Sequence, residues 1–319
     1  MAQARQAVAD WQAGKFTPAT PTPGQSTEEL VRQLERQLAF QPAPQGLQVN
    51  LNEPRVANTD RGTVVSFPAT VGSVGGEVRI TLRGGQVTRA GFALEGGRLP
   101  AWTESPLAWG LFGLFSLLFV YAIFGASRVG QLWREAWALT RQYRGLYIGI
   151  NVGLYGLFAL GSLVAYANPR IVALMQEVVG GALEQIGIGN AFAYGVAGLA
   201  TTIFYWNFTN GLILTTAVPG LLMGIPALLF NAARYFVLGF ALSPVALPLA
   251  GYLVHLPTVV VELQAYIFVT FGGMVLMTKV LKGEGYRKGL RALGLTVLVG
   301  AFFLVVGAWY EAFSLSLLR

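Results

Sequence analysis

The chain has 319 residues, of which 54% are hydrophobic and 12% charged, and its net charge is +7. That share of charge is about half the share in a typical soluble domain, so the composition indicates a membrane protein. The sequence has no cysteine, which excludes disulfides, thiolate catalysis and cysteine-based metal sites. The basic residues gather beside apolar runs, where orientation in a membrane explains them, and we expect no nucleic-acid binding.

Residues 1–105 predict a small soluble α+β domain, because they hold 19 of the 37 Lys, Arg, Asp and Glu residues. A short helix is expected over residues 1–14, and a second helix begins after Ser26 or Thr27 as N-cap. Strand-like runs follow, and the RGGQ segment at 83–86 is typical of a hairpin turn. This domain contains no histidine and no acid pair with catalytic spacing, so we expect a docking or spacer domain.

Residues 106–319 predict a transmembrane helical domain. The first span is expected at 107–127 and the second at 146–167, where Gly149 and Gly153 form a GxxxG pair that permits close helix contact, although such pairs are frequent by chance. Between these spans, residues 128–145 carry a net charge of +3 and form either a helix on the membrane interface or an ordinary linker. An amphipathic helix on the outer side is expected within residues 168–190.

The remaining chain predicts four more spans, which makes about six in all. Residues 191–229 are apolar and uncharged, with a break expected near Pro219 to Pro226, and the fourth span follows to about Ser243. Pro257 suits the first turn of the fifth span, and the last span is expected at 292–310. The loop at 279–291 has a net charge of +4. Both basic segments predict the same cytoplasmic side, so we expect both termini and the N-terminal domain on the other side.

Five polar side chains stand inside the apolar runs and form the candidate intramembrane site. They are Asn207, Asn231, Arg234, His255 and Glu262. A charge near the bilayer centre costs about 2.5 to 3.5 kcal/mol, so such side chains face a partner or a wet cavity. In a helix, positions 255, 258 and 262 share one face.

The residue types leave several interpretations open. Arg234 and Glu262 could form a structural ion pair, or Arg234, His255 and Glu262 could bind an ion or relay protons. A hydrolase would need Ser243, His255 and Glu262 to meet, but their spacing carries no signature. One histidine and one intramembrane glutamate fall short of the three ligands of a catalytic zinc, so no metal site is expected.

Residues 132–318 contain a pattern of motifs that points to a family. The segment REAWALTRQYRGLYIGIN leads into a span, FYWN stands at 204–207, and a Gly- and Pro-rich reversal precedes the apolar run that contains Asn231. The last element pairs Pro257 with the Glu262-Leu263 dipeptide, while Thr258 and Val259 stand where a histidine and a glycine are usual. In these motifs the chain resembles the stage II sporulation protein M family, which are bacterial polytopic membrane proteins.

The resemblance implies a role rather than a reaction. Members of the family act as membrane scaffolds for peptidoglycan-remodelling enzymes, so we expect a non-enzymatic scaffold or assembly protein of the bacterial cytoplasmic (inner) membrane. Its expected partners are the lipid bilayer and envelope proteins such as cell-wall hydrolases, with no cofactor, and a homo-oligomer is left open. The alternative is a transporter or channel component that uses Arg234, His255 and Glu262.

Overall fold

The structure is a computed structural model that describes residues 1–16, 26–59, 62–94, 99–168, 171–172, 194–245 and 249–317. The described residues form two units, and the chain passes from the first to the second between Leu99 and Pro100, close to the expected boundary at 105. The first unit is a small α+β domain, called the head below. The second unit contains the apolar helices and is called the bundle.

The head is built on a five-stranded antiparallel sheet. Its strands are β1 (Leu47–Val49), β2 (Arg55–Thr59), β3 (Gly62–Val71), β4 (Val74–Arg83) and β5 (Gln86–Leu94). The order is β1-β3-β4-β5, and β2 also pairs with β3. Between β4 and β5, Gly84 and Gly85 have φ values of 57° and 79°. Two successive positive φ angles suit a tight hairpin and favour glycine, which confirms the predicted turn at 83–86.

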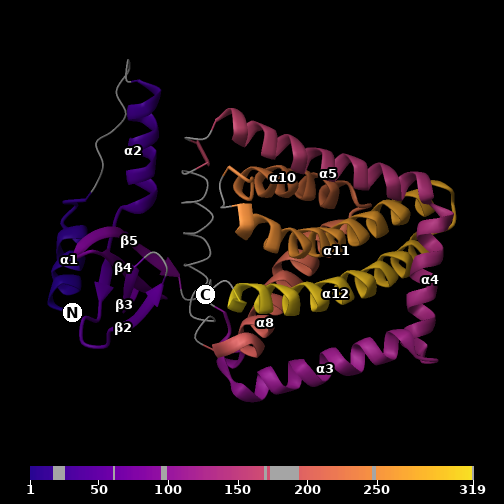
Figure 1. Ribbon diagram of the computed structural model, residues 1–319, viewed down its shortest axis with the longest axis horizontal. Helices are drawn as coiled ribbons and strands as arrows, with labels where there is room; N and C mark the ends of the chain where they lie inside the picture. Colours follow the sequence, from indigo (N-terminus) through magenta and orange to yellow (C-terminus); the bar gives the residue numbers. More distant parts are fainter. Residues whose placement is uncertain are drawn as a thin grey trace. The chain divides into compact units, whose positions relative to one another are not determined.

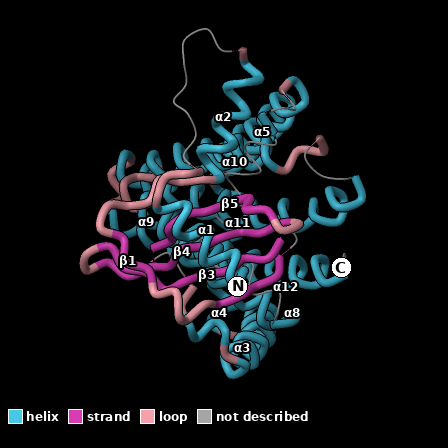
Figure 2. Tube along the Cα trace, turned by 90° about the vertical axis from the view of Figure 1, so that its left-hand side faces the viewer, coloured by secondary structure: helices cyan, strands magenta, loops and turns pink. Residues whose placement is uncertain are grey.

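One face of the sheet is covered by helix α1 (Ala2–Gln12) (Figure 2). The buried face of α1 presents Ala4, Ala7, Val8 and Trp11, at the spacing of an amphipathic helix. These side chains pack with inward-facing residues of the strands, among them Phe67, which is fully buried. The indole Nε1 of Trp11 donates a 2.6 Å hydrogen bond to the carbonyl oxygen of Gln41. The head therefore has a hydrophobic core of its own.

Helix α2 (Thr27–Ala39) begins where the sequence predicts, with Ser26 as its N-cap. The Ser26 hydroxyl accepts a hydrogen bond from the Glu29 backbone N–H at 3.3 Å, and the Glu29 carboxylate accepts one from the Ser26 N–H at 2.9 Å. This capping box satisfies two backbone donors that the helix itself leaves open. The Glu29 carboxylate accepts from the Ser26 N–H and, at 3.0 Å, from the Ser26 hydroxyl, and these two hydrogen bonds hold the pKa of Glu29 below its ordinary value.

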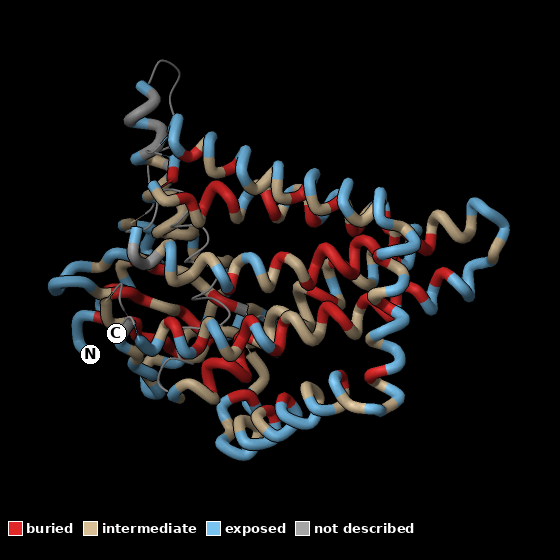
Figure 3. Tube along the Cα trace, turned by 45° about the vertical axis from the view of Figure 1, so that its right-hand side comes forward, coloured by how far each residue is buried: buried red, intermediate tan, exposed pale blue. Residues whose placement is uncertain are grey.

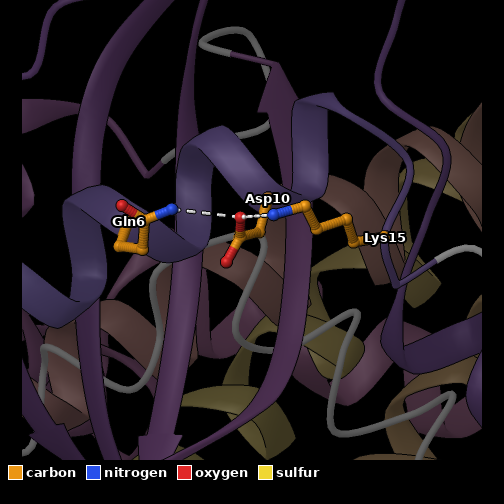
Figure 4. Close-up of polar contacts among 3 residues, drawn as sticks. All are labelled: Gln6, Asp10 and Lys15. Atoms are coloured by element: carbon orange, nitrogen blue, oxygen red, sulfur yellow. Dashed lines mark hydrogen bonds and ion pairs between the residues drawn. The ribbon is translucent and has the colours of Figure 1, made fainter.

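The solvent face of α1 carries a small polar cluster (Figure 4). The Asp10 carboxylate accepts hydrogen bonds from Lys15 Nζ at 2.6 Å and from Gln6 Nε2 at 3.1 Å. Lys15 and then Gln6 lower the pKa of the Asp10 carboxyl. The cluster is an exposed ion pair at the end of a helix, and pairs of this kind contribute little to stability.

The bundle consists of a 3-10 turn followed by helices. They are η2 (Ala101–Glu104), α3 (Pro106–Phe124), α4 (Arg128–Gln142), α5 (Arg144–Ala167), α8 (Gly195–Trp206), the π-helix η4 (Asn207–Ala217), α9 (Val218–Gly220), α10 (Ile225–Ala241), α11 (Leu249–Leu281) and α12 (Tyr286–Leu317). Four of them, α3, α5, α11 and α12, are long and apolar enough to cross a membrane. Helix α10 has 17 residues and is about 25 Å long, and the segment from α8 to α9 is divided by η4. The described residues therefore contain four candidate spans, and the expected total of about six stays a prediction.

Both basic segments of the sequence lie at one end of the bundle. Figure 1 shows α4 running across the ends of α3, α5, α11 and α12, near the turn between α11 and α12. Arg291 of α12 donates a 2.8 Å hydrogen bond to the Glu135 carboxylate of α4, and Lys279 lies 5.7 Å from the centre of the Tyr143 ring. Residues 128–142 are thus helical, as one of the two interpretations of that segment predicted. The positions of these basic residues agree with the prediction that both segments face the same side.

Helices α11 and α12 form the central pair of the bundle, and their buried faces stand out in Figure 3. The close contact of α5 with a neighbouring helix is not at the GxxxG pair. Gly149 and Gly153 face open space, whereas Gly161 of α5 lies directly against the backbone of α10, where Gly239 in turn meets the backbone of Phe158. The GxxxG pair thus permits a close contact that the bundle does not make there, because the spacing does not say which helical face meets a neighbour.

Two helix ends differ from expectation. Helix α11 begins at Leu249, so Pro257 lies inside it rather than in its first turn. Proline removes one backbone donor, and the half-exposed stretch around it tolerates that loss within a long helix. Helix α12 continues to Leu317 instead of ending at 310, which places Glu311 within the bundle. The amphipathic helix predicted within 168–190 lies almost entirely outside the described residues.

Candidate intramembrane site

The predicted polar residues come from α11 and from two elements that contact it. Asn207 begins the π-helix η4, Asn231 and Arg234 lie on α10, and His255 and Glu262 lie on α11 itself. Elements η4, α10 and α12 all contact α11. A π-helix widens the backbone turn and often marks a functional position, and here it begins at a site residue.

Close approach to α11 depends on glycine at two positions. A methyl group at Gly211 of η4 would overlap the hydroxyl of Tyr266, and one at Gly307 of α12 would lie 3.0 Å from Cγ of Glu262. The absence of side chains at these positions leaves the room that Tyr266 and Glu262 occupy. The glycines thus fix which neighbouring helix faces each polar side chain.

The first part of the site is a pair of carboxyl groups joined to an amide. Asn207 Nδ2 donates a 2.8 Å hydrogen bond to Glu262 Oε1, and the hydroxyl of Tyr266 donates to Asn207 Oδ1 at 3.3 Å. The carboxyl of Glu262 also lies within hydrogen-bonding range of the carboxyl of Glu311 on α12. Two carboxyl groups can hydrogen-bond to each other only when one of them carries a proton, because an ionised carboxylate is an acceptor alone. We call Asn207, Glu262, Tyr266 and Glu311 the carboxyl cluster.

The second part of the site holds Arg234. Its guanidinium donates to Asn231 Oδ1 at 2.8 Å and to Thr216 Oγ1 at 3.4 Å, and it also bonds the Thr215 hydroxyl. The guanidinium carbon lies 4.4 Å from the centre of the Tyr266 ring, which is a favourable cation–π distance. Tyr266 therefore contacts Arg234 with its ring and the carboxyl cluster with its hydroxyl.

The hypothesis of a direct ion pair between Arg234 and Glu262 is wrong for the described part of the chain, where no ion pair joins them. They are connected instead through Tyr266 and Asn207. The physical reason is that hydroxyl and amide acceptors of α10 and η4 surround Arg234 and meet its donors before any acid can.

Asn231 has the most enclosed position of the predicted residues, since it is fully buried. Its Nδ2 donates to Thr270 Oγ1 at 2.9 Å and to the Ala227 carbonyl at 3.0 Å, while its Oδ1 accepts from Arg234. All of its polar atoms have partners, as a buried amide requires. Its role is to hold Arg234 in place and to join α10 to α11.

His255 lies outside the carboxyl cluster, two helical turns before Glu262, and its buried Nδ1 has no partner in the described part of the protein. Thr258 lies between the two on the same face, and its hydroxyl is also buried without a partner. Across the helix pair, Tyr310 donates to the Val254 carbonyl at 3.2 Å, while Gly307 lies against Glu262. Because α11 and α12 run in opposite directions, Thr258, one turn before Glu262, lies across from the turn of α12 that follows Gly307 and leads to Glu311.

The structure does not bring Ser243, His255 and Glu262 together as a hydrolase would require. Ser243 is fully buried after the end of α10, and its hydroxyl accepts a 3.4 Å hydrogen bond from the Val245 N–H. Within the residues that the structure describes, no hydrogen bond joins Ser243 to His255 or Glu262. No group of three His, Asp or Glu side chains that could hold a metal ion occurs among the same residues.

Sequence reasoning missed three residues of the site. Glu311 and Tyr266 were not among the predicted site residues, and Thr258 was considered only for its position on the helix face. Glu311 was placed after the last span, although apolar residues continue beyond it at Ala312, Phe313 and Leu315. A single acid inside an unbroken helical pattern was the signal that could have found it. Tyr266 lies one turn after Glu262 on the same face, which is the signal for its proximity.

Comparison with protein families, with curated proteins and with solved structures found no match for this chain. Membership in the stage II sporulation protein M family therefore stays a prediction from the quoted motifs.

Proposed function

We propose that this protein is an ion-coupled component of a membrane transporter or channel, with the carboxyl cluster as its ion-binding site. The observation that carries the proposal is the contact between the Glu262 and Glu311 carboxyls inside the bundle, held by Asn207. Ionisable groups are rare within membrane spans, and those that meet there usually belong to an ion pathway or a proton relay.

The electrostatic setting supports this proposal over a purely structural role. A structural ion pair would join opposite charges, but the two acids contact each other, and Arg234 is held away from them by Tyr266. Two like charges in contact are unfavourable unless a proton or another cation is bound. Reversible binding of that cation is the elementary step of an ion-coupled carrier.

The position of the carboxyl cluster along α11 indicates the side of the membrane from which an ion would reach it. Glu262 lies ten residues after Tyr252, where the candidate span in α11 begins, which is about 15 Å along the helix. The basic segments lie at the opposite end of α11, and we propose that this end faces the cytoplasm of a bacterial inner membrane, with several passes of the chain. An ion would then reach the carboxyl cluster from the outer side.

Charge movement in reconstituted vesicles tests the proposal without knowledge of the transported substrate. Vesicles that contain the full chain are adsorbed on a solid-supported membrane, and the transient current after a pH jump is recorded. We expect a transient in the wild-type protein and a loss of most of its amplitude in Glu262→Gln at equal protein content. Glu135→Gln, which removes an exposed carboxylate on α4, is the matched control and should keep the wild-type transient. A flat wild-type trace would refute the proposal.

A second candidate is the scaffold or assembly role that the family resemblance implies. The observation that favours it is the head, a separate unit with its own core, which offers a docking domain distinct from the membrane bundle. Its partners would be envelope proteins such as cell-wall hydrolases. Because the chain has no cysteine, single cysteines at the exposed positions Glu53 and Lys282 can be labelled in intact cells with an impermeant reagent. Labelling at 53 alone supports an external docking head, and labelling at 282 alone contradicts it.

A further inference from the structure

The charges around the carboxyl cluster indicate how many cations it holds. The elements that contact α11 contribute few ionisable side chains near the cluster besides tyrosines: η4 has none, α10 has Arg234 and α12 has Glu311. The basic residues of α12, Arg287, Lys288 and Arg291, lie at its other end, where Arg291 pairs with Glu135 of α4. Helix α11 itself adds Glu262 and the half-buried His255 near the cluster, and its Lys279 lies in the last turn, paired with Glu284. With both acids ionised and Arg234 charged, the site carries one net negative charge, and a single monovalent cation neutralises it. A divalent ion would overshoot neutrality, and calcium would need six to eight oxygen ligands.

The hydroxyl of Thr258 indicates whether the cluster binds a proton or a larger cation. Only 3% of this residue is exposed, and its hydroxyl has no hydrogen-bond partner. Threonines elsewhere in the bundle bond a carbonyl of their own helix, as Thr278 does to the Met274 carbonyl at 2.9 Å. The equivalent carbonyl for Thr258 belongs to Val254, which accepts instead from Tyr310. A buried hydroxyl without a partner calls for a ligand, and a proton shared by two carboxyls would make no use of it.

We propose that Glu262, Glu311 and the hydroxyl of Thr258 bind one sodium ion, in exchange for the proton that the two carboxyls otherwise share. The inference rests on the proposed function and names its ion. Carboxylate and hydroxyl oxygens are hard donors that suit such an ion, and the antiparallel pairing of α11 and α12 brings Thr258 and Glu311 within about one helical turn of Glu262. One Na⁺ enters as one H⁺ leaves, so the charge of the site is unchanged.

The experiment measures proton release by the purified full chain in detergent. Sodium chloride is added to protein in weakly buffered solution with a pH-indicating dye, and choline chloride at the same ionic strength is the reference. We expect sodium to release up to one proton per chain, and choline to release none. Glu311→Gln should abolish the release. Thr258→Val, which keeps the shape of the side chain, should raise the sodium concentration for half-release at least about tenfold, because one direct ligand is lost.

The control is Thr278→Val. This variant removes a hydroxyl of α11 that already has a hydrogen-bond partner, the Met274 carbonyl of the same helix. It should leave the sodium dependence unchanged. Equal weakening by Thr258→Val and Thr278→Val would overturn the assignment of Thr258, and so would no weakening by either. Release by choline as well as by sodium would overturn a built sodium site.

The pH-jump current and the sodium-induced proton release together distinguish failure of this inference from failure of the proposed function. If the pH jump gives a current that depends on Glu262 while sodium releases no proton, the site is a proton site, and only the sodium inference fails. If neither the pH jump nor sodium gives a response in the wild-type protein, both proposals fail. A current after a sodium jump that Thr258→Val shifts to higher sodium supports both.

Discussion

Substitution of Gly161 by alanine should destabilise the bundle, and the same substitution at Gly149 should not. A methyl group at Gly161 would overlap the backbone carbonyl oxygen of Phe236, and would lie 2.9 Å from the Phe240 nitrogen. Backbone atoms of a helix cannot turn aside as a side chain can, so α5 and α10 must move apart. Overpacking of this kind costs about 1 to 3 kcal/mol.

Two further terms decide the size of the effect. Separation of the helices would weaken the 2.8 Å hydrogen bond from the Ser162 hydroxyl to the Gly239 carbonyl, which is worth about 0.6 kcal/mol in a membrane bundle. Alanine gains up to about 1 kcal/mol over glycine in helix propensity, at either position. Because Gly149 faces open space, its substitution keeps only that gain. The difference between the two variants should therefore be about 2 kcal/mol or more.

The assay is reversible unfolding of the purified protein in mixed micelles with increasing denaturing detergent, followed by helix content. Gly161→Ala should unfold at a lower detergent fraction than the wild type, and Gly149→Ala at an equal or higher one. Equal destabilisation by both would refute the packing of α5 on α10. Destabilisation by Gly149→Ala alone would restore the GxxxG interpretation.

Three further predictions concern the head and the site. Trp11→Phe should leave the Gln41 carbonyl without its partner and destabilise the head by about 1 to 3 kcal/mol, measured by amide hydrogen exchange in the full chain; unchanged exchange would contradict this. The pKa of Glu29 is lower in the folded protein than in the unfolded chain, so the ionised Glu29 carboxylate stabilises the folded state. This stabilisation is fully present above the ordinary glutamate pKa and is lost as pH falls through the lowered value. Exchange protection of α2 should therefore drop at acidic pH, and protection that is equal at neutral and acidic pH would oppose the capping box. Gly211→Ala should displace Tyr266 and reduce the current after a pH jump, and a wild-type current would show that Tyr266 has no part in the site.

The sequence predicted local structure well where one segment contains the whole signal. The Ser26 capping box, the hairpin at Gly84 and Gly85, and the membrane character of the apolar helices all follow from short-range patterns. The break between η4 and α10 also lies in the expected region, where Met223 and Gly224 both have positive φ angles. Each of these features depends on residues that are close in the sequence: a few positions for the cap and the turns, and about 20 consecutive residues for an apolar helix.

The sequence could not predict which polar side chains meet. Helical periodicity places His255, Thr258 and Glu262 on one face of α11, but it does not say which helix covers that face. Glu311 reaches Glu262 only because α12 continues past residue 310 and packs antiparallel to α11. Likewise, hydroxyls and an amide meet Arg234 because the π-helix η4 turns Thr215 and Thr216 toward it, and no pattern in the sequence announced that helix type.

The central claim is that Glu262 and Glu311 hold a proton between them at neutral pH. Infrared difference spectroscopy on the reconstituted protein tests it most directly, since the carbonyl stretch of a protonated carboxylic acid is separate from carboxylate bands, and exposed acids are ionised at that pH. We expect such a band in the wild-type protein, its loss in Glu262→Gln and in Glu311→Gln, and its retention in Glu135→Gln. A wild-type spectrum without that band, or a band that survives both substitutions within the pair, would contradict it.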